Sequence, residues 1–345
     1  MDSTILLILL QDGAVNGAIY ALLALSLVLV FAVTRVIYVA QGEFVAYGAL
    51  TYAALDGGQL PGSVWLLCGL GVAAFIAGLW QGRGQTDAGL LLRLGLETVL
   101  LPGAVALLAI WLAPLKPGML VEVALTLAIV TPMSPLLYRI AFQPLADAPV
   151  LVLLIAAVAL HLALTGLGLV FFGPEGFRAP AFSEAILTVG PLTIPGQALW
   201  IGGLTLALMV ALFGFFGRTL TGKALRATAV NRLGARLVGI PTERAGLIAF
   251  ALAGFIGALS GVLIVPLTTV YYDSGFMIGL RGFTAAIIGG LGSYPGAVLA
   301  AVLVGVAESF SSFWASAFKE VIVFTAIIPV LLWRSLRHGS TEEEE

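Results

Sequence analysis

The sequence predicts an all-α protein, a polytopic bundle of membrane-spanning helices, and three observations carry that prediction. Hydrophobic residues make up 60% of the 345 residues and charged residues only 10%, with a mean hydropathy of +1.10. Soluble domains carry about 25% charged residues, so this surface must face lipid. Apolar runs recur along the whole chain, and a crossing needs about 20 apolar residues. The basic residues concentrate in the stretches between those runs.

About eleven apolar segments are predicted to cross or enter the membrane, as helices because a helix satisfies its own backbone in lipid. The first six are Ala14–Val33, Glu43–Leu55, Val64–Trp80, Leu96–Ala113, Met119–Tyr138 and Pro149–Phe172. The other five are Gln197–Gly217, Glu243–Val265, Phe276–Leu291, Tyr294–Ser312 and Lys319–Trp333. Two of them, Glu43–Leu55 and Phe276–Leu291, are short and are candidates for half-helices or re-entrant segments.

The distribution of basic residues predicts the orientation of the chain. The stretch Arg218–Arg244 holds six of the sixteen Lys and Arg residues. Basic loops stay in the cytoplasm, and placing this stretch there leaves twelve of the sixteen inside. The N-terminus then lies outside and the C-terminus in the cytoplasm. A true crossing at Phe276–Leu291 is favoured, because a re-entrant segment would put Arg334 and Arg337 outside.

We expect one membrane domain over residues 1–337, followed by a solvated, disordered acidic tail at 338–345. Met1–Thr4 lacks the basic region of a cleavable signal, so the first span is expected to be retained. A single cysteine, Cys68, rules out an internal disulfide. No residues have metal-ligand or catalytic-triad spacing, and the net charge of −2 does not suggest nucleic acid binding. The composition therefore argues against an enzyme, a metal and a cofactor.

One near-match to a nucleotide-binding motif lies at Gly217–Ala224. A phosphate-binding loop needs Ser or Thr after its lysine and a strand before it. Here Ala224 follows Lys223, and a predicted membrane helix precedes the loop. We therefore predict that the chain has no ATPase site of its own.

The basic stretch itself predicts a cytoplasmic helix over Lys223–Ile240. Leu225, Ala229, Leu233, Leu237 and Ile240 would form one apolar stripe. Gly239 and the following Ile240-Pro241 would end the helix. Physical reasoning leaves two interpretations equal, a helix docked on a partner protein and an interfacial helix on anionic lipid.

Polar residues within the apolar segments are candidates for a transport pathway: Asn16, Tyr20, Gln41, Glu43 and Tyr47. A charged residue inside a membrane is energetically costly and usually has a functional role. Glu43 would also suit a simple helix cap. His161 has no carboxylate near it in the sequence, and we expect it to have a packing role. Arg281 and Glu308 are candidates for an ion pair within the bundle. Gly13/Gly17, Gly257/Gly261 and Gly292/Gly296 have the spacing of close helix contacts.

Two blocks of sequence resemble a known family. The first is Asn16-Gly17-Ala18-Ile19-Tyr20-Ala21-Leu22 with Gly42-Glu43-Phe44. The second runs from Arg226-Ala227-Thr228-Ala229 to Phe283-Thr284-Ala285-Ala286 and Gly289-Gly290-Leu291-Gly292-Ser293-Tyr294-Pro295-Gly296-Ala297. They resemble the inner-membrane permease of ABC importers for branched-chain amino acids, the LivH type. Against that family, residues 56–118 look like an insertion of two extra spans.

The resemblance implies a multi-pass protein of the bacterial inner membrane that moves branched-chain or related small amino acids inward. It implies as partners a second related permease, two cytoplasmic ATP-binding subunits and a periplasmic substrate-binding protein. Residues 218–244 would be the cytoplasmic coupling segment, with contacts to the ATPase from Arg226, Asn231, Arg232, Arg236, Leu237 and Gly239.

The substrate stays open, because Tyr38-Val39-Ala40-Gln41-Gly42-Glu43 departs from the family's usual Asn-Phe-Ala-His-Gly-Glu. An importer of urea, short amides or aromatic acids is the near alternative. An ion-coupled secondary transporter is the more distant one, and it would need His161 or Glu308 as a proton relay.

Overall fold

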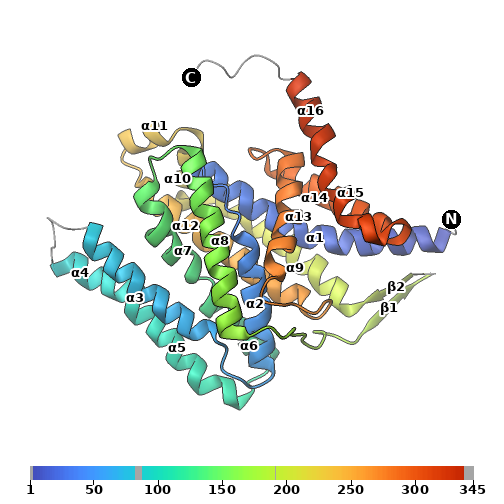
Figure 1. Cartoon of the computed structure of the whole chain (residues 1–345), viewed down its shortest axis with the longest axis horizontal. Helices are drawn as coiled ribbons and strands as arrows, with labels where there is room; N and C mark the ends of the chain where they lie inside the picture. The colour runs from blue at the N-terminus through green and yellow to red at the C-terminus, as the bar shows by residue number, and fades with distance from the viewer. Residues whose placement is uncertain (1–2, 82–87, 191, 338–345) are drawn as a thin grey trace.

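The computed structural model describes residues 3–81, 88–190 and 192–337, and its regular structure is almost entirely helical (Figure 1). The first half contains α1 (Ser3–Thr34), α2 (Gln41–Asp56), α3 (Ser63–Gln81), α4 (Ala88–Gly95), α5 (Leu101–Leu112), α6 (Met119–Val130), α7 (Met133–Leu137) and α8 (Val150–Phe172). The second half contains α9 (Gly196–Arg218), α10 (Leu220–Val230), α11 (Arg232–Leu237), α12 (Thr242–Ile264), α13 (Ser274–Gly289), α14 (Tyr294–Trp314), α15 (Lys319–Thr325) and α16 (Ile327–Arg337). The predicted acidic tail, 338–345, lies outside the described residues.

The all-α membrane fold is confirmed, and each predicted apolar segment is helical. Within the described residues, eight helical stretches are long and apolar enough to cross a membrane, and α13 is a shorter apolar helix. The last predicted span, Lys319–Trp333, divides at Ala326 into α15 and α16. The count of eleven crossings and the sides of the two termini therefore stay predictions.

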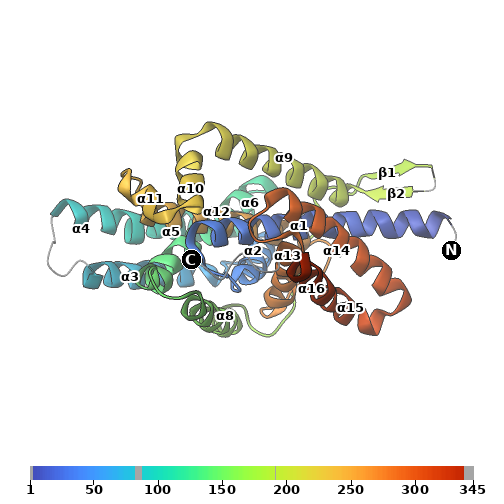
Figure 2. The same ribbon diagram turned by 90° about the horizontal axis from the view of Figure 1, so that it is seen from above.

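The loop between α8 and α9 contains a small antiparallel hairpin. Strand β1 (Ile186–Val189) pairs with β2 (Leu192–Pro195), with Ile186 opposite Pro195. It lies beside the N-terminal end of α1 in both views (Figures 1 and 2). The Gln11 side chain donates a hydrogen bond of 3.1 Å to the Thr193 carbonyl of this hairpin.

The helices surround a central group formed by α1, α2 and α12. Seen from above, α9 and α8 lie on opposite sides of that group (Figure 2). The stretch from α3 to α5, most of the predicted insertion, gathers at one end of the molecule, away from the N-terminus (Figure 1). Its outer side chains are apolar and exposed, including Trp65, Leu107 and Trp111. These exposed apolar surfaces are suited to contact with lipid.

Glycines bring the central helices into backbone contact. A methyl group on Gly13 would lie 2.6 Å from the Val306 Cα atom of α14, and one on Gly17 would lie 2.8 Å from the Val302 Cα atom. On α12, Gly257 and Gly261 face α2 in the same way. Such contacts hold helices together in lipid, where no hydrophobic force acts between them. Two of the predicted glycine pairs are thus confirmed. In the third pair, a methyl group added to Gly292 would have no neighbour within 4 Å, so Gly292 makes no close helix contact.

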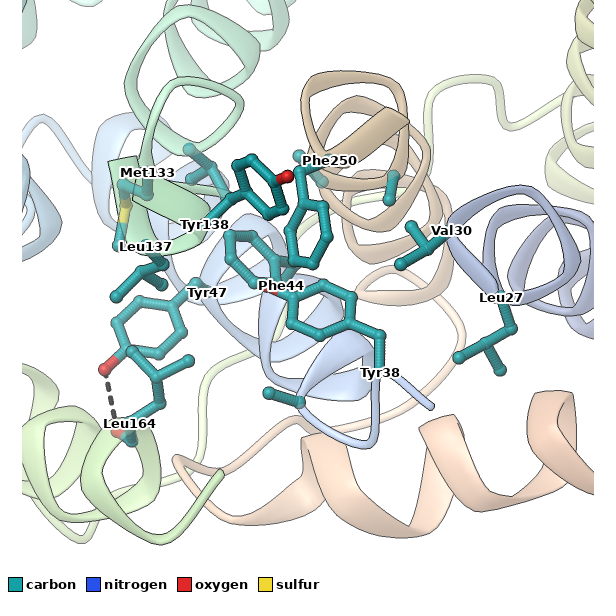
Figure 3. Packing of buried hydrophobic residues seen from close by; sticks show 14 of the residues in the cluster. Leu27, Val30, Tyr38, Phe44, Tyr47, Met133, Leu137, Tyr138, Leu164 and Phe250 are labelled. Carbon is teal, nitrogen blue, oxygen red and sulfur yellow. Dashed lines mark hydrogen bonds between the residues drawn. The ribbon is translucent and has the colours of Figure 1, made fainter. Parts of the chain in front are cut away.

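Aromatic side chains fill the core between α2, α7 and α12 (Figure 3). The Phe250 ring lies 4.6 Å from Tyr38 and 4.7 Å from Tyr138, measured between ring centroids. Tyr38 precedes α2 and is fully buried. This packing holds residues 36–40, which lead into α2, largely inside the protein, whereas Arg35 is exposed.

Candidate functional site

Helix α2 begins inside the bundle. The chain leaves α1 at Thr34, turns at Arg35 with a left-handed φ of 60°, and starts α2 at Gln41. The side-chain Nε2 atom of Gln41 donates a hydrogen bond of 2.9 Å to the carbonyl of Ala253, which lies near the middle of α12. Every residue from Gln41 to Leu55 is buried. The short predicted segment is therefore an interior helix whose first turn lies level with the centre of a long span.

The first turn of α2 carries a buried ionisable pair. The Glu43 side chain is fully buried, and its Oε1 atom lies 2.9 Å from Nδ1 of His161 on α8. The His161 ring stacks on Phe276 of α13, with 4.7 Å between centroids. Ionisable groups are costly in the membrane interior and pair with one another there. The expectation that His161 has only a packing role, for want of a nearby carboxylate, is wrong, because Glu43 lies 118 positions away in sequence but adjacent in space.

Three of the five pathway candidates lie together on α2. Gln41 and Tyr47 are 1% and 2% exposed, and Glu43 lies between them in sequence. The Tyr47 hydroxyl donates a hydrogen bond of 2.8 Å to the Leu164 carbonyl of α8, drawn as the dashed line in Figure 3. Glu43 and Tyr47 are one turn apart and both contact α8, so α8 is the partner of this polar face.

The other two candidates, Asn16 and Tyr20, lie on α1. Asn16 is half-buried. The Tyr20 hydroxyl donates a hydrogen bond of 2.5 Å to Glu308 of α14, and Glu308 forms an ion pair of 3.1 Å with Arg281 of α13. The predicted Arg281–Glu308 pair is confirmed, and Arg281 also lies 3.5 Å from Glu320. Tyr20 therefore belongs to a second polar cluster, and the structure does not bring all five candidates to one site.

The predicted cytoplasmic helix over Lys223–Ile240 is interrupted, and the expectation of one continuous helix is wrong. The chain becomes extended at Asn231, with φ −151° and ψ 102°, and its side-chain Oδ1 accepts a hydrogen bond of 2.8 Å from the Gly234 amide. Asparagine is a strong N-cap residue, so it starts a second helix, α11, instead of continuing α10. The predicted end of the helix is confirmed at Gly239, which has a left-handed φ of 81°.

The break separates the predicted apolar stripe into two parts. Leu225 is buried against Leu29, Val33 and Ala249, and it anchors α10 to the bundle. Leu233 and Leu237 on α11 are instead 69% and 80% exposed. The two leucines of α11 therefore point away from the bundle, whereas Ala235 of the same helix is buried.

The predicted coupling residues surround this exposed surface. Arg226, Asn231, Leu237 and Gly239 are exposed. Arg232 donates a hydrogen bond of 2.7 Å to the Ala146 carbonyl, and Arg236 donates one of 3.0 Å to the Thr242 hydroxyl. The two arginines thus tie α11 to the loop before α8 and to the start of α12. Residues 217–224 form the junction of α9 and α10 rather than a loop after a strand, unlike a phosphate-binding loop.

Comparisons with known proteins agree with this architecture. The family model described as branched-chain amino acid transport system / permease component matches residues 88–331. The permease protein LivH of Escherichia coli (strain K12) is 32% identical over 56% of this chain and 65% of its own length, so the chain spans about two thirds of that relative. The permease protein BraD of Pseudomonas aeruginosa is 26% identical over 94% of this chain and 92% of its own length. PsaBC from Streptococcus pneumoniae, solved in complex with Fab, covers 95% of this chain at 12% identity with a TM-score of 0.37, too low to carry an argument.

The helical bundle with polar groups buried between its spans defines a multi-pass transport subunit of the inner membrane. The chain belongs to the permease component family of branched-chain amino acid transport systems. The resemblance seen in the sequence is thereby confirmed.

Proposed function

We propose that this chain is the permease subunit of an ABC importer that moves branched-chain or related small amino acids inward. The match to the permease family over residues 88–331 carries this proposal. The names of LivH and BraD supply the substrate class, since both are described as high-affinity branched-chain amino acid transport proteins. The partners would be a second permease, two ATP-binding subunits and a periplasmic binding protein.

The geometry of α11 supports the coupling role. Its exposed Leu233 and Leu237 offer an apolar surface, and the preceding helix α10 carries the exposed Arg226, a composition suited to a groove on a protein partner. Arg236 connects α11 to the first residue of α12. Helix α12 in turn contacts α2 through Gly257 and Gly261. A push on α11 would therefore reach the helix that carries Glu43 through these two contacts.

A matched pair of double variants tests this role. Leu233→Asp with Leu237→Asp places charges on the apolar surface of α11, and we expect copurification of the ATP-binding subunits and amino acid uptake to fall at least about tenfold. Ile186→Asp with Leu187→Asp makes the same change on the exposed β1 strand and should leave association with the ATP-binding subunits intact. Full ATPase association of the α11 variant, at normal abundance in the membrane, would rule out α11 as the docking element.

The energy source distinguishes this proposal from an ion-coupled transporter. The buried Glu43–His161 pair would be the natural proton relay of such a transporter. Uptake into vesicles should require ATP on the cytoplasmic face and persist when a protonophore collapses the proton gradient. Uptake that follows the gradient without ATP would favour the ion-coupled alternative.

A further inference from the structure

A cavity of about 400 Å³ lies beside the first turn of α2, between α8 and α13. Sites for small molecules have volumes of about 300–1,000 Å³ and apolar walls with a few polar groups. This cavity fits that description, because Val158, Leu162, Phe276 and Phe283 are among its apolar lining residues. Its polar lining residues are Tyr38, Gln41 and His161. Glu43 lies behind His161, 2.9 Å from its Nδ1 atom, rather than in the cavity wall. The polar groups therefore mark one corner of an otherwise apolar cavity, which opens at the surface of the chain beside Val158 and Leu162, 41% and 64% exposed.

That corner offers hydrogen-bond acceptors that the protein leaves unused. The Oε1 atom of Gln41 and the Oε2 atom of Glu43 are buried, and neither receives a hydrogen bond. The Thr165 hydroxyl lies near the Glu43 carboxyl, but it donates its proton to the His161 carbonyl at 3.0 Å. Leaving a buried acceptor unpaired costs about 1–3 kcal/mol. A ligand that brings N–H donors to this corner would recover that cost.

The charge at the corner favours a cation. The Glu43 carboxyl faces His161, whose Nδ1 atom is its one side-chain hydrogen-bond partner among the described residues. Asp273, just before α13, adds a second carboxylate to the same environment. Arg281, the basic residue of α13, does not neutralise these carboxylates, because it forms ion pairs with Glu308 and Glu320. A primary ammonium group, with three donors and one positive charge, matches these groups.

The position of the corner is fixed by backbone contact. A methyl group on Gly42 would overlap the Gly275 carbonyl of α13 and lie 2.9 Å from the Gly279 Cα atom. Helices α2 and α13 therefore meet without intervening side chains immediately beside the cavity. Their relative movement would open or close the chamber and shift Gln41 and Glu43 together.

We propose that this cavity is a station for the transported amino acid within the membrane. The ammonium group binds Gln41 Oε1 and the carboxylate of Glu43, displacing the His161 ring, and the aliphatic side chain lies against Val158 and Phe276. This assignment rests on the proposed function and adds to it the groups that recognise the substrate inside the permease.

Protection of an introduced cysteine from a thiol reagent tests the station in the assembled transporter. Leu162→Cys, in a Cys68→Ser background, places a thiol in the cavity wall; the variant is first checked for uptake. Leucine and isopentylamine, which carry the ammonium group, should slow labelling about tenfold, because the interaction is a charged hydrogen bond. At the same concentration 4-methylpentanoate, which lacks that group, should not protect.

Two carboxamide substitutions identify the group responsible. Glu43→Gln should abolish protection by leucine, whereas Glu122→Gln, at a buried carboxyl on α6 outside the cavity, should retain it. If Glu43→Gln does not reach the membrane, Gln41→Leu removes the second acceptor. In the same assay it should weaken protection by leucine, and unchanged protection would count against the station.

The outcomes separate the station from the function. Equal protection by the deaminated acid, or none by leucine while uptake proceeds, would overturn the station and leave the importer proposal intact. Such results would also follow if a lipid chain filled the cavity. Absence of uptake of leucine, isoleucine, valine and other small amino acids by the unaltered transporter with all its subunits would overturn the function itself.

Discussion

Single residues in this protein acquire their meaning from partners that are distant in sequence. Glu43 suited a helix cap as well as a pathway role when considered alone, and His161 suited simple packing. The contact of 2.9 Å between them explains why both side chains are in the bundle, because each gives the other a polar partner in an apolar interior. Arg281 and Glu308 obey the same physics, and they are separated by little enough sequence to be predicted as a pair.

The Arg281 cluster should be one of the stabilising centres of the bundle. Glu308→Leu leaves the Arg281 guanidinium, which is largely buried, with the longer contact to Glu320 and the Tyr20 ring, whose centroid lies 5.9 Å away. Breaking a buried ion pair costs about 3–5 kcal/mol, so we expect a clear fall in the thermal midpoint measured in detergent.

Two further variants separate the lost ion pair from a change in packing. Arg281→Leu combined with Glu308→Leu should restore part of the lost stability, because the buried guanidinium is removed together with its partner and Glu320, which loses its cation, is partly exposed. Glu320→Gln, at the more exposed end of the same arginine, should have a smaller effect. Equal losses for the single and double leucine variants would show that charge pairing is not the cause.

At the scale of helices, close backbone contacts decide where short elements lie. Helix α2 has 16 residues and would fall short of a bilayer crossing, yet it is buried along its length because α12 and α13 present glycines to it. The coupling segment shows the opposite case. Asn231 caps a new helix locally, so periodicity across that residue predicted a stripe that the chain does not form.

The Gly42 contact yields a direct prediction about α2. Gly42→Ala introduces a methyl group that overlaps the Gly275 carbonyl, and overpacking of this kind costs about 1–3 kcal/mol. We expect a lower thermal midpoint and reduced uptake. Gly69→Ala on α3, where a methyl group meets nothing within 4 Å, is the matched control. An unchanged midpoint for Gly42→Ala would mean that α2 and α13 separate readily.

For the whole molecule, orientation in the membrane follows from charge placement rather than from contacts. Basic residues remain on the cytoplasmic side because their transfer across the bilayer is unfavourable. With Arg218–Arg244 inside, the β1–β2 hairpin faces the opposite side, where a periplasmic binding protein would dock.

Cysteine labelling in intact cells tests that orientation. In a Cys68→Ser background, Lys223→Cys on α10 should resist an impermeant thiol reagent until the cells are opened, since we place it in the cytoplasm. Thr188→Cys on β1 should react in intact cells once the outer membrane is permeable to the reagent. Labelling of Lys223→Cys from outside would invert the topology and remove the coupling segment from contact with any ATPase.

The sequence alone was enough to predict the class of the protein, the approximate positions of its apolar helices and the basic segment that we propose contacts a partner. Those features depend on hydropathy, charge and local motifs, which are properties of neighbouring residues. The three-dimensional arrangement of the helices was needed to see that Glu43 contacts His161, that Tyr20 bonds to Glu308, and that a cavity lies beside Gln41. Such contacts depend on which helices are neighbours. When a helix is apolar on all sides, its hydrophobic periodicity does not show which side faces a given neighbour.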